Sequence, residues 1–75
     1  MMTREQILQT LITRRDNYKR FVKKLNPGQR KKINTFKIRI MSLETCIRDL
    51  EQNVPHEIKG DFISTPSVKI KLTGV

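Results

Sequence analysis

The sequence has little of what small domains use for covalent or membrane anchoring. Its 75 residues include one cysteine, Cys46, so no disulfide can form within the chain. A lone free thiol fits a reducing compartment, and we expect a cytoplasmic protein. No apolar stretch approaches the roughly 20 residues that a membrane-spanning helix needs, and no apolar run follows a basic leader. We therefore expect no membrane partner.

Residues that carry catalysis or bind metals are equally scarce. The chain has one histidine, His56, and seven scattered acids, and it offers no Ser/His/Asp set, glycine-rich phosphate loop or paired carboxylates. Cys46, Asp49 and His56 do not have the spacing of a metal site. Cys46 also lacks a neighbouring base that would activate its thiol. We expect a protein that is not an enzyme and has no metal site and no cofactor.

The chain is also short, so one domain is expected. A chain of 75 residues buries a small fraction of its surface, and its core is marginal. Association of identical chains is a common remedy for a small core. We therefore expect a homo-oligomer.

Apolar spacing predicts a first helix over about residues 3–25. Thr3 and Gln6 have the spacing of a capping box at its start. Arg14 occupies one position of the apolar stripe; we expect its long side chain to extend past the core to water. The alternatives are an ion pair with Glu44 or an anion held by a second subunit. The apolar positions of the stripe are Ile7, Leu11, Tyr18, Phe21 and Leu25.

A second helix is predicted over about residues 27–53, with Asn26 as its cap and Pro27 in its first turn. Asn53 and Pro55 should end it. Two long helices with so short a connection should fold back antiparallel, as a coiled-coil hairpin over residues 1–55. Its apolar positions follow an alternating spacing of three and four: Ile33, Phe36, Ile40, Leu43, Ile47, Leu50 and Val54.

Residues 56–75 have the pattern of a β-hairpin. Val68–Thr73 alternates strictly between apolar and polar residues, and Ile58–Phe62 does so more weakly because Gly60 occupies an inward position. Ser64–Ser67 has the composition of a turn. An isolated hairpin is barely stable, so it must pack on the helices or pair with another chain. The predicted fold class is mainly α: an antiparallel two-helix coiled-coil hairpin with a short C-terminal β-hairpin.

Positive charge is concentrated in one part of the chain. Eleven of the sixteen basic residues but one of the seven acids lie between Arg14 and Arg39, so this segment carries +10 and the remainder −1. The predicted fold-back brings most of these cations to one end of the hairpin. Such a concentrated field usually faces a partner of opposite sign. The candidate anion-binding residues are Arg15, Lys19, Arg20, Lys23, Lys24, Arg30, Lys31, Lys32 and Lys37.

The cations at the start of the second helix conflict with its dipole. A sequence chosen for helix stability alone would place acids at residues 29–32, and such local conflicts are expected at functional sites. The leading hypothesis is a protein that binds nucleic acid or another polyanion with little sequence preference, because phosphate neutralisation needs only charge and reach. Tyr18, Phe21 and Phe36 could stack on bases, but they lie on the apolar stripes, so we expect core packing.

Two alternatives remain open. The chain could be a small protein-binding regulator or inhibitor, which grips an acidic protein surface with its basic end or adds its last strand to a partner's sheet. It could also be an oligomer that sequesters a small nucleotide-like anion. Ile38 and Met41 lie off the apolar stripe of the second helix and could seat the tail or another subunit. The candidate contact residues are Ile38, Met41, Val68, Ile70 and Leu72.

Overall fold

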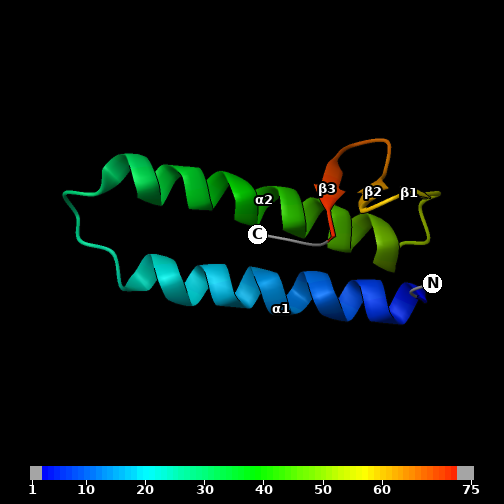
Figure 1. Cartoon of the computed structure of the whole chain (residues 1–75), viewed down its shortest axis with the longest axis horizontal. Coiled ribbons are helices and arrows are strands. Elements are labelled where there is room, and N and C mark those ends of the chain that lie inside the picture. The colour runs from blue at the N-terminus through cyan, green and yellow to red at the C-terminus, as the bar shows by residue number, and fades with distance from the viewer. Residues whose placement is uncertain (1–2, 73–75) are drawn as a thin grey trace.

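Two long antiparallel helices lie side by side, and a small sheet covers them at one end (Figure 1). The structure is a computed structural model that describes residues 3–72. It measures 39 × 21 × 20 Å along its principal axes. The predicted fold class, mainly α with a two-helix hairpin and β-structure after it, is confirmed.

Helix α1 spans Arg4–Lys23 and begins with the predicted capping box. The backbone N–H of Gln6 donates to Thr3 Oγ1 at 3.2 Å, and the backbone N–H of Thr3 donates to Gln6 Oε1 at 2.8 Å. The helix ends slightly before residue 25, the predicted end. At that point the backbone N–H of Lys24 bonds to the carbonyl three residues back, at 3.0 Å, and the chain tightens into a turn.

Helix α2 spans Arg30–Glu51, so it begins later than predicted. The prediction that Asn26 caps this helix and that Pro27 lies in its first turn is wrong. Instead Asn26 and Gln29 bond to each other: the N–H of Gln29 donates to Asn26 O at 2.9 Å, and the N–H of Asn26 donates to Gln29 Oε1 at 3.1 Å. These bonds close a turn around Pro27, and the Gln29 N–H that the Asn26 side chain would have capped donates to the Asn26 carbonyl instead.

Helix α2 ends where the sequence predicts a stop. Glu51 is its last residue, and Asn53 follows with a φ of +58°. Asparagine tolerates this left-handed conformation and is a common residue just after a helix. The reversal is held by the backbone N–H of Val54, which donates to Asp49 O at 2.9 Å. After this reversal the chain runs back along the helices and forms the sheet.

The sheet has three antiparallel strands rather than the predicted two: β1 Glu57–Lys59, β2 Phe62–Ser64 and β3 Lys69–Lys71, in that order. The region predicted as one weak strand turns back at Gly60, whose φ is +56°. Lys59 and Phe62 face each other across that two-residue turn, as in a hairpin with glycine at its first central position. Thr73, the last residue of the predicted strand, lies outside the described residues.

The core lies in the half of the helical hairpin that the sheet covers. Ile63 of β2 is fully buried, and its neighbours across the sheet are Ile58 and Ile70. One face of the sheet thus closes the space that two helices alone leave open. The buried cluster consists of Ile7, Leu11, Leu43, Cys46, Ile47, Leu50, Ile63 and Leu72.

Two arginines of α1 fasten the elements together. The Arg4 guanidinium donates from Nε to the carbonyl of Leu50 near the end of α2, at 3.0 Å. The Arg14 guanidinium donates to the carbonyls of Lys71 and Leu72, at 2.6 Å for Leu72. The expectation that the Arg14 side chain extends past the core to water is therefore wrong, and within the described residues it does not form the alternative ion pair with Glu44 either. It reaches the tail because β3 lies across the hairpin at that level.

Candidate anion-binding surface

Seven cations from the two helices gather at the end of the molecule where the chain reverses. The end of α1 and the start of α2 lie there together because the helices run antiparallel (Figure 1). Each of the seven side chains is exposed. We call this group the basic tip; its members are Lys19, Arg20, Lys23, Lys24, Arg30, Lys31 and Lys32.

Most of the charge of the basic tip is not neutralised within the chain. Lys19 Nζ lies 3.5 Å from Glu44 Oε2, and Arg20 donates to the neutral side chain of Asn17. Across residues 3–72, no other member of the basic tip has an acidic side chain within ion-pair distance. Six like charges thus share a small exposed region, which is an unfavourable arrangement unless an anion joins it.

The remaining predicted anion-binding residues lie along the helices below the basic tip. Arg15 is half-buried, and its Nε donates to Asp16 Oδ1 at 3.1 Å. Its charge is therefore partly compensated. Lys37 is exposed on α2, without an acidic partner among the residues that the structure describes. Lys37 can contribute to the same field, whereas Arg15 contributes less.

The start of α2 is poorly arranged for helix stability. Its first turn has no acidic residue, and the side chain of Gln29 at its N-cap makes no capping bond. Cations there face the partial positive charge of the helix start, at a cost of a few tenths of a kcal/mol each. A shallow depression lies over this turn, lined by Gly28, Gln29, Arg30, Lys31, Lys32 and Asn34.

Three aromatic rings adjoin the basic tip and form what we call the aromatic cluster: Tyr18, Phe21 and Phe36. The centroid of the Phe36 ring lies 4.8 Å from that of Phe21 and 5.3 Å from that of Tyr18. The prediction of core packing holds only for Tyr18, which packs against the buried cluster. Phe21 is 38% exposed and Phe36 is half-buried, because the sheet covers the other half of the hairpin.

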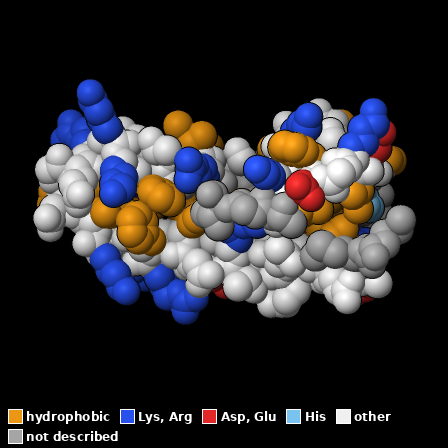
Figure 2. Space-filling model, in the orientation of Figure 1, with side chains coloured by type: hydrophobic (Ala, Val, Ile, Leu, Met, Phe, Trp, Pro, Cys, Tyr) orange, Lys and Arg blue, Asp and Glu red, His pale blue; other side chains and the backbone are white. Residues whose placement is uncertain are grey.

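Cations flank the aromatic cluster. Lys32 Nζ lies 5.8 Å from the centroid of Phe21, and the guanidinium carbon of Arg39 lies 5.2 Å from that of Phe36. These distances suit weak cation–π contacts at an exposed site. Figure 2 shows the result as an apolar area bordered by Lys and Arg side chains, in the half of the molecule away from the sheet.

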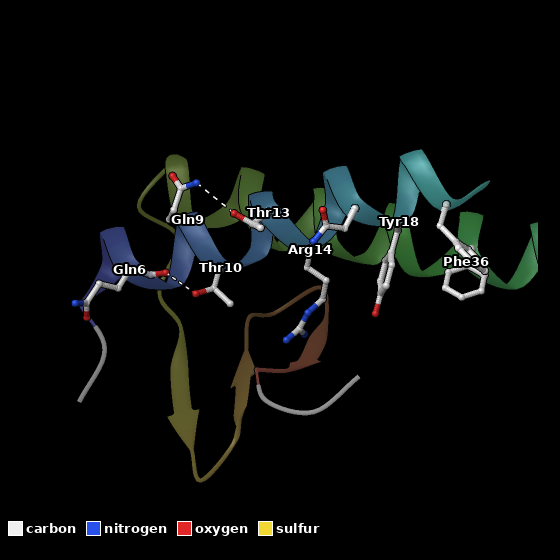
Figure 3. Close-up of a pocket in the computed structure, with 9 residues that line it drawn as sticks. Gln6, Gln9, Thr10, Thr13, Arg14, Tyr18 and Phe36 are labelled. Atoms are coloured by element: carbon white, nitrogen blue, oxygen red, sulfur yellow. Dashed lines mark hydrogen bonds between the residues drawn. The ribbon is translucent and has the colours of Figure 1, made fainter. Parts of the chain in front are cut away.

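A groove leads from the aromatic cluster along α1. In the close-up, Arg14, Tyr18 and Phe36 point toward the side of the hairpin on which the sheet lies (Figure 3). Sequence reasoning missed this groove, although its polar residues recur at helical spacing and so share one face of α1. The polar residues that line it are Gln6, Gln9, Thr10, Thr13 and Asn17.

The predicted contact residues have different environments. Leu72 is buried in the core, and Val68 and Ile70 pack against that core from the sheet. These three residues contact their own chain in the structure. Ile38 and Met41 remain 64% and 66% exposed, so the sheet does not cover them as the sequence interpretation allowed.

Metal-ligating side chains do not cluster in the described part of the chain, and its Cys46 thiol is buried. No group of three His, Cys, Asp or Glu side chains within residues 3–72 is arranged to hold a metal ion. Burial raises the pKa of the Cys46 thiol to about 11, and the nearby charge of Asp49 adds to the effect.

Neither helix of the described chain is long and apolar enough to cross a bilayer.

Comparisons of the chain with protein-family models, curated proteins and solved structures gave no match. The function must therefore be inferred from the geometry itself.

Proposed function

We propose that this protein is a non-enzymatic nucleic-acid-binding protein that holds phosphates at its basic tip with little sequence preference. One observation carries the proposal: two helices bring seven exposed cations to one end, and six of them have no acidic partner among the described residues. Such a cluster is costly for the free chain. A polyanion relieves the repulsion and releases its own counterions.

The shape of the basic tip favours phosphate contacts over base-specific readout. Its cations are long side chains spread over the outer surfaces of two helix ends, and Lys in particular acts as a mobile point charge. Phosphate contacts of this kind position a nucleic acid without reading its sequence. The described fold has two helices and therefore lacks the three-helix arrangement of a helix-turn-helix domain.

Fluorescence polarisation with labelled oligonucleotides at two salt concentrations tests the proposal. With about six phosphate contacts, affinity should fall by roughly a thousandfold between about 50 mM and 200 mM salt. Several unrelated sequences should bind with similar affinity. Failure to bind any DNA or RNA at the lower salt concentration would end the proposal.

A matched pair of variants separates the basic tip from net charge. Arg30→Gln/Lys31→Gln/Lys32→Gln removes three cations from the basic tip, and Lys59→Gln/Lys69→Gln/Lys71→Gln removes three exposed cations from the sheet. Both triple variants lower the net charge of +9 by the same amount. The tip variant should lose affinity at least tenfold with a shallower salt dependence, and the sheet variant should lose little. Equal losses would show a general charge effect.

Strand addition by the tail is less well supported as an alternative. The carbonyls of Lys71 and Leu72 accept hydrogen bonds from Arg14, and the Leu72 side chain is buried in the chain's own core. Detaching β3 for a partner would break these contacts. An acidic protein surface at the basic tip remains a competing ligand, and a titration with polyglutamate compares it directly with nucleic acid.

A further inference from the structure

The aromatic cluster beside the basic tip points to the form of nucleic acid that is bound. We propose that the ligand is single-stranded, with its bases stacked on the exposed ring of Phe21 beside Phe36 and Tyr18 and its phosphates on the basic tip. This inference rests on the proposed function and names the substrate class of that same site.

The aromatic cluster is partly accessible to solvent: Tyr18 packs against the core, whereas Phe36 is half-buried and Phe21 is exposed. The ring of Phe36 contacts both others, with its centroid 4.8 Å from that of Phe21 and 5.3 Å from that of Tyr18, and Phe21 is 38% exposed. Tyr18 and Phe36 point toward the sheet side of the hairpin (Figure 3), and the sheet stops short of this half (Figure 1). A base laid on the cluster would cover apolar area that the folded chain leaves in water.

Charged groups lie at the right distance to hold the backbone of a stacked nucleotide. Lys32 Nζ is 5.8 Å from the centre of the Phe21 ring, and the Arg39 guanidinium is 5.2 Å from that of Phe36. Lys32 lies over the face of the Phe21 ring, so a base that stacks on Phe21 displaces this weak contact and brings its flanking phosphates within reach of the freed ammonium. Aromatic rings interleaved with cations are the arrangement by which proteins bind single strands without reading sequence.

The groove along α1 extends the same surface. Beyond Arg14 and the aromatic cluster, its lining side chains are amides and hydroxyls, with Thr13 Oγ1 accepting a bond from Gln9 Nε2 at 3.3 Å. Such groups donate to and accept from the edges of unpaired bases. A duplex hides its base faces and pairing edges, so it could use the basic tip but neither the aromatic cluster nor these polar groups.

A second copy of the chain fits this surface less well than an anion does. A symmetric contact through the aromatic cluster would bring the two basic tips close together, and six cations of each lack acidic partners among the described residues. Like charges brought together at an interface oppose association. A single strand supplies both the missing negative charge and the apolar ring faces.

The test compares Phe21→Leu with Phe62→Leu. Phe62 lies on the sheet at the opposite end, is also 38% exposed, and has Lys69 Nζ 4.7 Å from its ring centroid, so it matches Phe21 in exposure and charge environment. Leucine keeps apolar bulk and removes the ring face. Binding is measured with a single strand and its duplex, and circular dichroism confirms folding of each variant.

We expect the wild-type chain to bind the single strand at least tenfold more tightly than the duplex. Phe21→Leu should weaken single-strand binding about tenfold and duplex binding little, because base–aromatic stacking contributes on this scale. Phe62→Leu should leave both unchanged. Tyr18 is the one tyrosine in a chain without tryptophan, so quenching of its fluorescence by a single strand, and not by an abasic phosphate backbone, reports stacking directly.

The outcomes distinguish this inference from the proposed function. Equal affinity for single strand and duplex, with Phe21→Leu behaving like wild type, would overturn single-strand stacking and leave phosphate binding intact. Absence of binding to either form would overturn both. Polyglutamate that competes as strongly as a single strand, without quenching Tyr18, would identify an acidic protein as the ligand and also overturn the inference.

Discussion

Arg14 Nη2 donates a hydrogen bond to the carbonyl oxygen of Leu72 at 2.6 Å, and its Nη1 donates to the carbonyl of Lys71. One guanidinium on α1 thus holds two successive carbonyls at the end of β3. The tail is thereby tied to the helix that starts the chain, and the sheet is fixed over the core. The planar fork of arginine suits this double contact, which the single ammonium of lysine cannot reproduce.

We predict that Arg14→Lys destabilises the chain by about 1–3 kcal/mol, the scale of hydrogen bonds to a charged group. Chemical denaturation measures this loss, and hydrogen exchange should show faster exchange in β2 and β3. Arg15→Lys is the control, because Arg15 bonds only to the adjacent Asp16 in the described structure and should cost less than about 0.5 kcal/mol. Equal effects of the two changes would contradict the role assigned to Arg14.

A second contact between sheet and helices is made by Thr65. Its Oγ1 donates to Asp49 Oδ2 at 2.8 Å and accepts from the backbone N–H groups of Ser67 and Val68. Both Thr65 and Asp49 are buried. Thr65→Val keeps the shape but leaves the Asp49 carboxyl and the turn amides without this partner. We expect a loss of about 1–3 kcal/mol in the free energy of unfolding, measured by urea titration.

Thr65→Ser provides the control for that prediction, because serine retains the hydroxyl and loses one methyl group. It should cost about 1 kcal/mol or less, the scale of one buried methyl group. If valine is tolerated as well as serine at residue 65, the hydrogen bond to Asp49 does not stabilise the fold.

The regular parts of the fold could be predicted because their signals are local. The apolar spacing of Ile33 to Leu50 defines one face of a helix whatever surrounds it, and Thr3 and Gln6 bond within one turn. The short strands were harder, because alternation across Gly60 resembles a continuing strand. Gly60-Asp61 also suits a two-residue hairpin turn, and the positive φ of Gly60 in the structure decides for the turn.

The candidate site was predictable in part for the same reason. The sequence positions of the cations and the chain reversal between the two helices are enough to predict that Lys24 and Arg30 lie at the same end of the hairpin. The exposure of Phe21 depends on which half of the hairpin the sheet covers, and that depends on contacts far apart in sequence, such as Arg14 with Leu72. The apolar stripes of the two helices do not show, from the sequence, which half of the hairpin the sheet will leave uncovered.

The glycines give a prediction about turns. Gly60 has a φ of +56°, where a side chain is strained, so Gly60→Ala should destabilise the chain by about 1 kcal/mol. Gly28 does not have a positive φ, and a Cβ there would meet nothing within 4 Å. Gly28→Ala should be neutral or stabilise by up to about 1 kcal/mol by restricting the unfolded chain. Thermal unfolding checks both, and the reverse order would contradict the turn geometry.

Cys46 should make stability depend on alkaline pH. Burial first, and then the charge of Asp49, raises the pKa of its thiol from 9.0 to about 11, so the folded chain holds this proton more tightly than the unfolded chain. The stability from this group is fully present below pH 9 and is lost as the pH rises toward 11, at about 1.4 kcal/mol per pH unit.

The measurement is the difference between wild type and Cys46→Ala across the same pH values, so that effects of alkaline pH common to both proteins cancel. The alanine variant should be less stable at neutral pH because it loses a fully buried side-chain atom, and the gap between the two proteins should narrow above pH 9. A gap that stays constant up to pH 11 would show that the thiol ionises as easily in the folded chain as in the unfolded one.

The basic tip should show a conflict between stability and binding. Lys31 lies in the first turn of α2 and Lys23 in the last turn of α1, where a cation is respectively unfavourable and favourable to the helix dipole. Lys31→Glu and Lys23→Glu change the charge of the same region equally, so both relieve its repulsion. The difference between them isolates the dipole. The free energy of unfolding of Lys31→Glu should exceed that of Lys23→Glu by about 1 kcal/mol, which corresponds to roughly 4–8 °C in Tm.

Both changes should weaken nucleic-acid binding, because each reverses one cation of the basic tip. Lys31→Glu should then have a higher Tm than wild type and a lower affinity for nucleic acid. A variant that binds less because it is unfolded could not show this combination. Asn34→Gln is a neutral control at an exposed position nearby on the same helix, and it should alter neither property appreciably. If Lys31→Glu raises Tm and binding is unchanged, the lysine at the start of α2 serves neither the helix nor a phosphate, and the functional reason inferred for its position is wrong.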